Sequence, residues 1–255
     1  MSGLVYSVFE WASIVGLLLL AVRLYQTRLN KRYPVFFAYV LFRLPMAVLV
    51  LSLPLSSNTY FYFWVFTEPF VWLFYVWVVL ELFRLSLSRH RGLYTLGKWA
   101  MYVGMVISVF ISILLVLPKM KPTPDSRLVG YMMGADRGIT LSLAIFVILM
   151  LFLLTRYPVP LSRNVVLHVT LYTVFFLSNT LTVLAQSVFG LHLYMPIDLG
   201  LLGISTICVM AWLCFLAPEG EDVRVNIPHL APENEQRLLG HLDALNATLL
   251  KAAQK

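Results

Sequence analysis

Seven long apolar stretches separated by short polar joints dominate this chain of 255 residues. A bilayer core about 30 Å thick needs about 20 residues of helix to cross it, so each stretch has the length of a membrane-spanning helix. The stretches cover approximately residues 4–22, 34–55, 60–82, 99–117, 129–154, 165–189 and 197–216. The pattern predicts an all-α membrane protein built as a bundle of seven transmembrane helices. In the fifth stretch, Asp136 and Arg137 precede a lipid-compatible part that we expect to begin at Gly138.

Composition supports lipid as the main solvent of this chain. Hydrophobic residues make up 60% of the sequence and charged residues 12%, and the mean hydropathy is +0.83. Soluble domains carry about 25% charged residues, which excludes an ordinary soluble fold. The net charge of +7 does not indicate nucleic-acid binding, because the basic residues lie in short clusters between apolar stretches rather than along one face.

The distribution of these basic residues predicts the orientation, because short loops rich in Lys and Arg stay in the cytoplasm. The joints after the first, third and fifth stretches hold ten such residues: Arg23, Arg28, Lys31, Arg32, Arg84, Arg89, Arg91, Lys98, Arg156 and Arg163. The opposite side holds three, Lys119, Lys121 and Arg127. We therefore expect the N-terminus outside and the C-terminus in the cytoplasm. The first five residues contain no basic side chain, so the first stretch is expected to remain as an anchor rather than a cleaved signal peptide.

Ionisable residues inside the stretches are the first candidates for function. Each costs at least about 2.5 to 3.5 kcal/mol near the membrane midplane and so needs a partner, water or a task. The candidate ligand-binding residues are Glu10, Arg43, Glu68, Arg137 and Asp198. Arg43 and Glu68 belong to adjacent stretches joined by a short turn, which predicts an ion pair between them. This pair either locks two helices together or contributes to a site.

Carboxylates outnumber cations in the outer part of the predicted bundle. Glu10, Glu68, Asp136 and Asp198 face only Arg43 and Arg137 there, among the ionisable residues of the stretches. Such an excess cannot persist in a dry site, which leaves three alternatives. Some carboxyls are protonated, or the outer half opens to water and a cation-bearing ligand, or the carboxylates are separate and share no common site.

Polar residues form a stripe along the sixth stretch. They advance by steps of three, four or seven residues, which keeps side chains on one face of a helix. The stripe comprises His168, Tyr172, Asn179, Thr182 and Gln186. In lipid this face must turn toward other helices, where it serves either as interhelical hydrogen-bonding or as the lining of a cavity or proton path.

The third stretch is unusually aromatic around Glu68. Eleven of its first eighteen residues are Phe, Tyr or Trp. These rings either contact lipid and neighbouring helices or stack on a planar ligand. Pro69 removes a backbone donor directly after Glu68, which makes a local opening of the bundle geometrically plausible there.

No catalytic signature is present, so we expect a protein without enzymatic activity and leave its cofactors unassigned. No lysine lies within a stretch, which excludes a retinal Schiff base. The sequence has no His-Glu-x-x-His or Gly-x-Ser-x-Gly motif, and its histidines are too scattered to indicate a metal site. Cys208 and Cys214 lie six residues apart in the last stretch and do not indicate a disulfide framework.

Polarity returns after the last stretch, which predicts two domains, a membrane domain over residues 1–217 and a cytoplasmic tail over 218–255. A short C-terminal helix is expected in the tail. Its leucines advance at heptad spacing and comprise Leu238, Leu242, Leu245 and Leu249. The helix either pairs as a short coiled coil in a dimer or lies amphipathically against the membrane.

Several motifs resemble those of uncharacterised seven-span membrane proteins of acidobacterial type. They are Arg32-Tyr33-Pro34 leading into Phe36-Phe37-Ala38-Tyr39, the acidic aromatic third stretch around Glu68, and Leu242-Asp243-Ala244-Leu245-Asn246 followed by Leu249-Leu250. The resemblance implies a multi-pass protein of the bacterial inner membrane and no particular activity.

Two functions fit these observations. In the first, the bundle senses a small ligand in its outer half and couples to partners through the tail, as a homodimer or within a larger complex. In the second, the protein is a structural or accessory subunit of a larger membrane complex. A transporter fits less well, because the stretches show no two-half symmetry.

Overall fold

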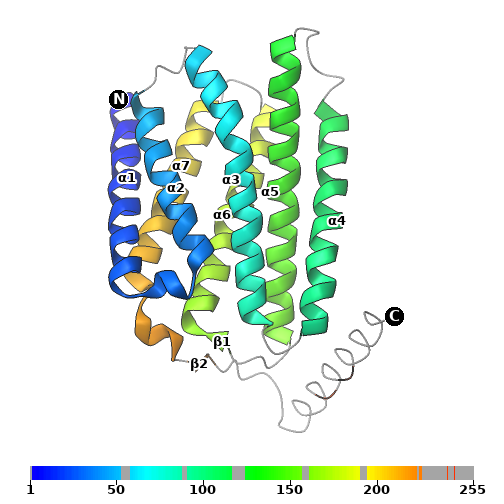
Figure 1. Cartoon of the computed structure of the whole chain (residues 1–255). Helices are drawn as coiled ribbons and strands as arrows, with labels where there is room; N and C mark the ends of the chain where they lie inside the picture. The colour runs from blue at the N-terminus through cyan, green and yellow to red at the C-terminus, as the bar shows by residue number, and fades with distance from the viewer. Residues whose placement is uncertain are drawn as a thin grey trace. The chain divides into compact units, whose positions relative to one another are not determined.

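Seven long helices make up nearly all of the structure, a computed structural model that describes residues 2–52, 58–87, 91–116, 124–156, 161–189, 194–222, 224–225, 240 and 244. The helices are α1 (Ser2–Gln26), α2 (Pro34–Ser52), α3 (Asn58–Ser86), α4 (Arg91–Val116), α5 (Pro124–Arg156), α6 (Arg163–Phe189) and α7 (Tyr194–Phe215) (Figure 1). Each is long and apolar enough to cross a membrane. The prediction of an all-α chain with seven apolar helices is confirmed.

The apolar part of α5 extends over Gly130–Phe152, which agrees with the predicted stretch over residues 129–154. The expectation that its lipid-compatible part begins at Gly138 stays a prediction. The helix runs through Asp136 and Arg137 without a break, because both residues can be helical and enough apolar side chains flank them on either side.

Local sequence explains how several helices begin. Pro34 opens α2, a position where its fixed φ suits the first turn and its missing N–H is not needed. The preceding 3₁₀ helix η1 (Leu29–Lys31) follows Arg28, whose φ of 58° is left-handed. At the start of α6, Ser162 Oγ accepts a hydrogen bond of 3.4 Å from the backbone N–H of Val165, as an N-cap does.

The chain forms two compact units. The first unit contains residues 1–78 and 174–218, and the second contains residues 79–173 and 219–255. Helices α3 and α6 each contribute one part to each unit.

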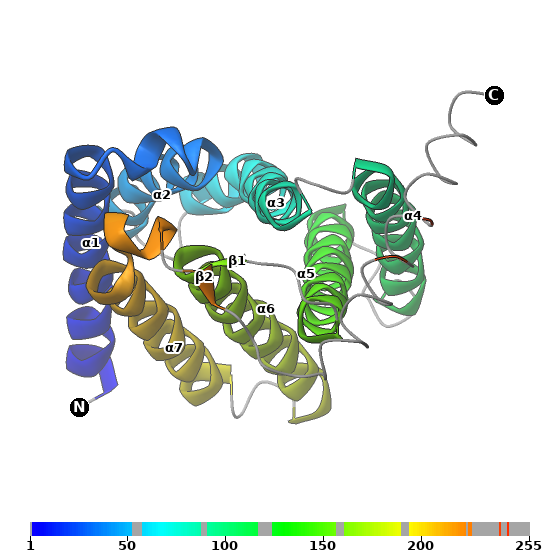
Figure 2. The same cartoon turned by 90° about the horizontal axis from the view of Figure 1, so that it is seen from below.

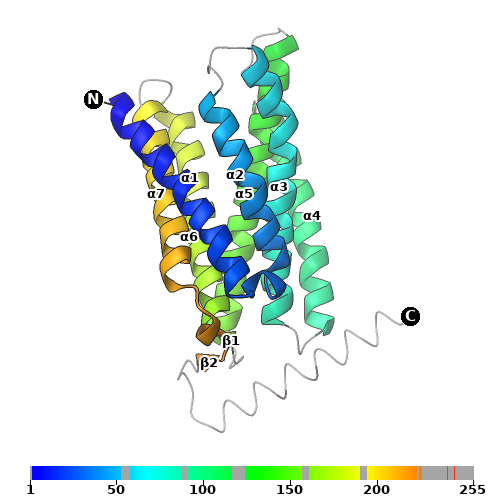
Figure 3. The same cartoon turned by 60° about the vertical axis from the view of Figure 1, so that its left-hand side comes forward.

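In the first unit, α1 contacts both α2 and α7 (Figure 2). Phe36 of α2 packs on Trp212 of α7 with ring centroids 5.1 Å apart, and both rings are buried. Arg23 Nη1 donates a hydrogen bond to the carbonyl of Leu213 in the last turn of α7. Helices α1 and α7 therefore run alongside one another (Figure 3), with a polar contact at the end where both finish.

In the second unit, α4 and α5 pack along their length. A Cβ on Gly138 of α5 would lie 2.5 Å from the Cα of Val109, so only a glycine permits this approach of the helix backbones. Two short strands, β1 (Leu161–Ser162) and β2 (Arg224–Val225), pair antiparallel. The 3₁₀ helix η4 (Pro218–Glu221) precedes β2.

Large apolar side chains cover the exterior of the helices. Those more than half exposed include Trp11, Phe66, Trp99, Val106, Phe110, Phe152 and Ile207. A soluble protein does not expose apolar surface on this scale. Together with the seven apolar helices, this surface indicates a multi-pass membrane protein.

Candidate functional site

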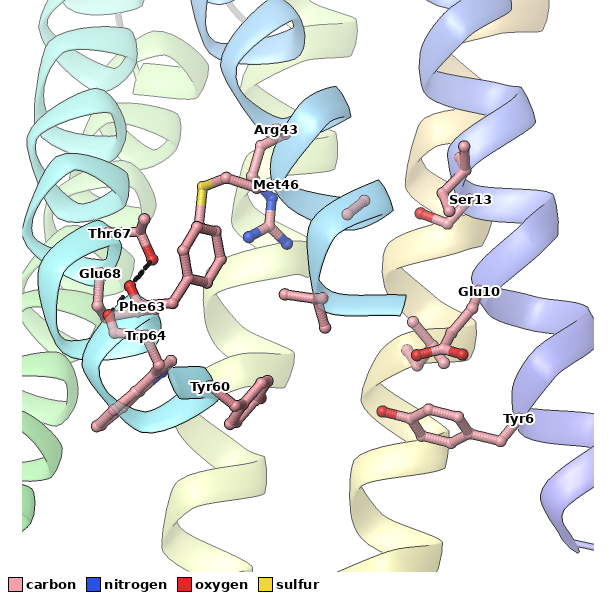
Figure 4. Close-up of a pocket in the computed structure, with 14 residues that line it drawn as sticks. Tyr6, Glu10, Ser13, Arg43, Met46, Tyr60, Phe63, Trp64, Thr67 and Glu68 are labelled. Carbon is pink, nitrogen blue, oxygen red and sulfur yellow. Dashed lines mark hydrogen bonds between the residues drawn. The ribbon is translucent and has the colours of Figure 1, made fainter. Parts of the chain in front are cut away.

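A cavity of about 240 Å³ lies within the first unit (Figure 4). Three helices, α1, α2 and α3, supply most of its walls, and Leu202 of α7 completes them. The other lining residues are Tyr6, Glu10, Ser13, Ile14, Arg43, Met46, Ala47, Val50, Tyr60, Phe63, Trp64, Thr67 and Glu68. Three of the five predicted ligand-binding residues are therefore brought together in one cavity.

The cavity lies toward one end of the first unit. Its lining residues come from the N-terminal halves of α1, α3 and α7 and from the C-terminal half of α2. Consecutive helices joined by short connections alternate in direction, so these four halves lie at the same end. Figure 4 shows Glu10 entering from α1, Arg43 from α2 and Glu68 from α3.

Two tyrosines position Arg43. Its side chain hydrogen-bonds to Tyr39, one helical turn earlier on α2, and Tyr39 also hydrogen-bonds to Tyr75 of α3. Both tyrosines are buried, and their ring centroids lie 5.7 Å apart. Because a guanidinium has five N–H donors, Arg43 can be held by Tyr39 and still present donors to the cavity.

Glu68 shares the cavity with Arg43 and attracts it electrostatically. The two charges therefore line the same cavity, and the ion pair predicted between them stays a prediction. Next to Glu68, the hydroxyl of Thr67 donates a hydrogen bond of 2.8 Å to the carbonyl of Phe63 in the same helix. Thr67 therefore satisfies its donor internally, whereas Pro69 has no N–H to continue the helical ladder.

Glu10 lies on the opposite wall, half-buried and directed into the cavity (Figure 4). Among the described residues it makes no hydrogen bond and no ion pair. One turn earlier on α1, the hydroxyl of Tyr6 hydrogen-bonds to the carboxylate of Asp198 on α7. Asp198 therefore adjoins the cavity through Tyr6 and does not line it.

The remaining predicted residues lie elsewhere. Arg137 is half-buried on α5 in the second unit. In the stripe on α6, His168 and Tyr172 are buried in the second unit and stack at 6.4 Å, with ring planes 16° apart. Asn179 and Thr182 are half-buried in the first unit.

Some predictions fall on residues that the structure leaves undescribed. The side chain of Gln186 lies outside the described residues, and so do the four tail leucines Leu238, Leu242, Leu245 and Leu249. The stripe residues that are described do not line the cavity of the first unit.

Sequence reasoning missed three features. The spacing of Gly134 and Gly138 on α5 was available as a small-residue packing signal. Tyr39 precedes Arg43 by one helical turn and could have been proposed as its partner. The third feature is a hydrogen bond of 2.8 Å from Asn164 Nδ2 to Glu221 Oε1, which no local pattern indicates.

Metal-binding chemistry has little support in the described part of the chain, where no group of three or more His, Cys, Asp or Glu residues could hold an ion. Cys208 is buried and Cys214 exposed, and neither forms a disulfide.

Comparison with known proteins adds no family to this picture. No family model, no curated protein and no solved structure matches the chain. The chemistry of the cavity is therefore inferred from its lining residues alone. They combine two carboxylates, one guanidinium and several aromatic rings. This combination suits the binding of a small polar molecule with an apolar part.

Proposed function

We propose that this chain is a non-enzymatic multi-pass membrane protein that binds a small molecule in the cavity of the first unit and signals through its tail. The proposal includes an N-terminus outside and a C-terminus in the cytoplasm of a bacterial cell, as the basic joints predict. In that orientation the cavity lies in the outer half of the membrane.

One observation carries the proposal. Glu10, Arg43 and Glu68 come from three different helices and meet in a cavity of about 240 Å³. Ionisable residues are costly inside a membrane and occur where they line a pathway or a site. Charges that only lock helices together need no open volume beside them, so the cavity favours ligand binding.

Helix α1 offers a route from the cavity to the tail. Glu10, in the N-terminal half of α1, lines the cavity. Arg23, near the C-terminal end of α1, donates a hydrogen bond to the carbonyl of Leu213. Leu213 lies in the last turn of α7, shortly before η4 and the tail begin. A small shift of α1 on ligand binding would therefore move the end of α7.

The tail provides the output in this proposal. Its leucines pair with a second copy of the chain or contact another membrane subunit, because a receptor without a catalytic domain must act through a partner. Tethering to the membrane raises the effective concentration of two such tails and so favours a short coiled coil.

Native mass spectrometry of the full chain from a mild detergent tests ligand binding. We expect a retained small mass on the wild-type protein and its loss in Ala47→Trp, which fills the cavity. Ala100→Trp is the matched control, because Ala100 lies on an exposed face of α4. Ser13→Leu, a smaller filling change, should lower the retained fraction in case Ala47→Trp folds poorly. The same mass on all four proteins would contradict the proposal.

A further inference from the structure

We propose that the ligand of this cavity carries an organic ammonium group whose positive charge pairs with Glu10. This inference rests on the proposed ligand-binding function and specifies its chemistry. It is carried by the charges of the lining residues, by the partners of each charge and by the composition of the walls.

The charges of the cavity do not balance. Arg43 supplies one positive charge, and Glu10 and Glu68 supply two carboxylates. Glu68 attracts Arg43 electrostatically, so these two form the balanced part of the site. Glu10 enters from a different helix and leaves one carboxylate that a single positive charge would neutralise.

Glu10 lacks what stabilises the other acidic groups nearby. The carboxylate of Asp198 accepts a hydrogen bond from Tyr6, whereas Glu10 has no hydrogen bond and no ion pair among the described residues. Half-burial withdraws part of the Glu10 carboxylate from water, which costs free energy unless a cation or hydrogen-bond donors reach it. A ligand cation supplies what the protein does not.

The walls favour an organic cation over a metal ion. Trp64, Tyr60 and Phe63 of α3 and Tyr6 of α1 line the cavity, and aromatic faces attract ammonium groups through cation–π interactions. Calcium binds about six to eight oxygen ligands. Aliphatic and aromatic side chains occupy most of this lining, so it suits a metal ion less well. The apolar remainder of the walls would contact the carbon skeleton of the ligand.

Two sources could supply such a group, a free amine and the ammonium headgroup of a phospholipid. The cavity belongs to helices that lipid surrounds, so both sources can reach it. The mass of the retained ligand separates them, because a phospholipid is several times heavier than an amine that fits about 240 Å³. Both sources carry the proposed ammonium group, and displacement of the retained ligand by an added amine would show that the two occupy the same site.

Calorimetric titration of the full chain in a nonionic detergent tests the inference. The probes are 2-phenylethylammonium and its neutral analogue 2-phenylethanol. Both titrations are carried out at the same sodium chloride concentration. We expect the ammonium to bind about tenfold more tightly than the alcohol. Glu10→Gln should abolish this difference, whereas Glu219→Gln, at an exposed position outside the cavity, should preserve it.

A second variant keeps the test informative if Glu10→Gln folds poorly. Trp64→Leu retains an apolar wall and removes an aromatic face, so it should weaken the ammonium severalfold and change the alcohol little. Equal binding of the two probes, with both lost in Ala47→Trp, would overturn the ammonium assignment and leave the cavity as a binding site. No binding of either probe, together with an unchanged retained mass in Ala47→Trp, would overturn the proposed function itself.

Discussion

Asn164 donates a hydrogen bond of 2.8 Å from Nδ2 to Oε1 of Glu221. This contact fixes the first residues after α7 against the start of α6 within the second unit. Gly220 fits beside it, because a Cβ there would lie 2.3 Å from Asn164 Oδ1. The β1–β2 ladder continues the same attachment. The beginning of the tail is therefore anchored to the helical part of the protein.

Replacing Asn164 with Ala should loosen this attachment without unfolding the helices. The change removes a hydrogen bond to a charged group, worth about 1 to 3 kcal/mol. We expect faster backbone hydrogen exchange in residues 218–225 and unchanged exchange in α4 and α5. Asp222→Asn, at an exposed position, is the control. Unchanged exchange in residues 218–225 of Asn164→Ala would show that the contact does not hold the tail.

Replacing Gly138 with Ala should disrupt the packing of α4 on α5. The added Cβ would meet the Cα of Val109 at 2.5 Å, and a backbone atom cannot move aside by changing rotamer. We expect the free energy of unfolding, measured by denaturation of the detergent-solubilised protein, to fall by about 1 to 3 kcal/mol. Gly104→Ala is the matched control, since its Cβ would lie an ordinary 3.9 Å from Ser142 Oγ. Equal stability of the two variants would contradict this packing.

Replacing Arg23 with Met should weaken the junction of α1 with the end of α7. Arg23 satisfies a carbonyl in the last turn of α7, where backbone acceptors have no helical donor. We expect a loss of about 1 to 2 kcal/mol and faster hydrogen exchange at residues 213–217. Lys31→Met, at an exposed position in η1, should have little effect. A comparable loss in both variants would point to a general effect of charge.

Replacing Tyr39 with Phe should release Arg43. The change removes the hydroxyl that bonds to both Arg43 and Tyr75 while preserving the ring packing. We expect a loss of about 1 to 2 kcal/mol in stability and a severalfold weaker affinity for the ligand retained by the wild type. Tyr25→Phe is the control, because this side chain is 70% exposed. Unchanged affinity in Tyr39→Phe would show that Arg43 needs no positioning by Tyr39.

Hydrophobic patterning predicted the helices well because length and apolarity alone decide whether a segment can span a bilayer. Six of the seven predicted stretches agree with their helices within about five residues at each end, whereas α4 begins at Arg91, well before the predicted start at residue 99. The start of the lipid-compatible part of α5 stays a prediction, because Asp136 and Arg137 lie inside an otherwise apolar helix.

The sequence identified the charged residues of the candidate site, but it did not show which of the predicted residues lie together. Glu10, Arg43 and Glu68 were identified because charges in apolar stretches are conspicuous, and they do share a cavity. Arg137 has the same local signal but belongs to the other unit. A sequence shows the cost of burying a charge, whereas the choice of neighbours depends on which helix faces pack together.

Contacts between distant segments were the least predictable. Asn164 and Glu221 are ordinary polar residues in polar joints, and nothing in their local sequence indicates a partner. The local sequence around Tyr6 likewise gives no sign that its hydroxyl hydrogen-bonds to Asp198 of α7. Such contacts follow from the path of the chain between helices, which periodicity does not specify.

A free small molecule can reach the cavity of the first unit from outside only if the cavity lining is accessible to water on the outer side of the membrane. Ser13 lines this cavity, so Ser13→Cys, in a background where Cys208 and Cys214 are replaced by Ala, should react with a membrane-impermeant thiol reagent added to intact cells. Asp222→Cys in the same background should react only after the membrane is permeabilised. Failure of Ser13→Cys to react before permeabilisation would contradict entry of a free ligand from the outer side. Reaction of Asp222→Cys in intact cells would contradict the proposed orientation.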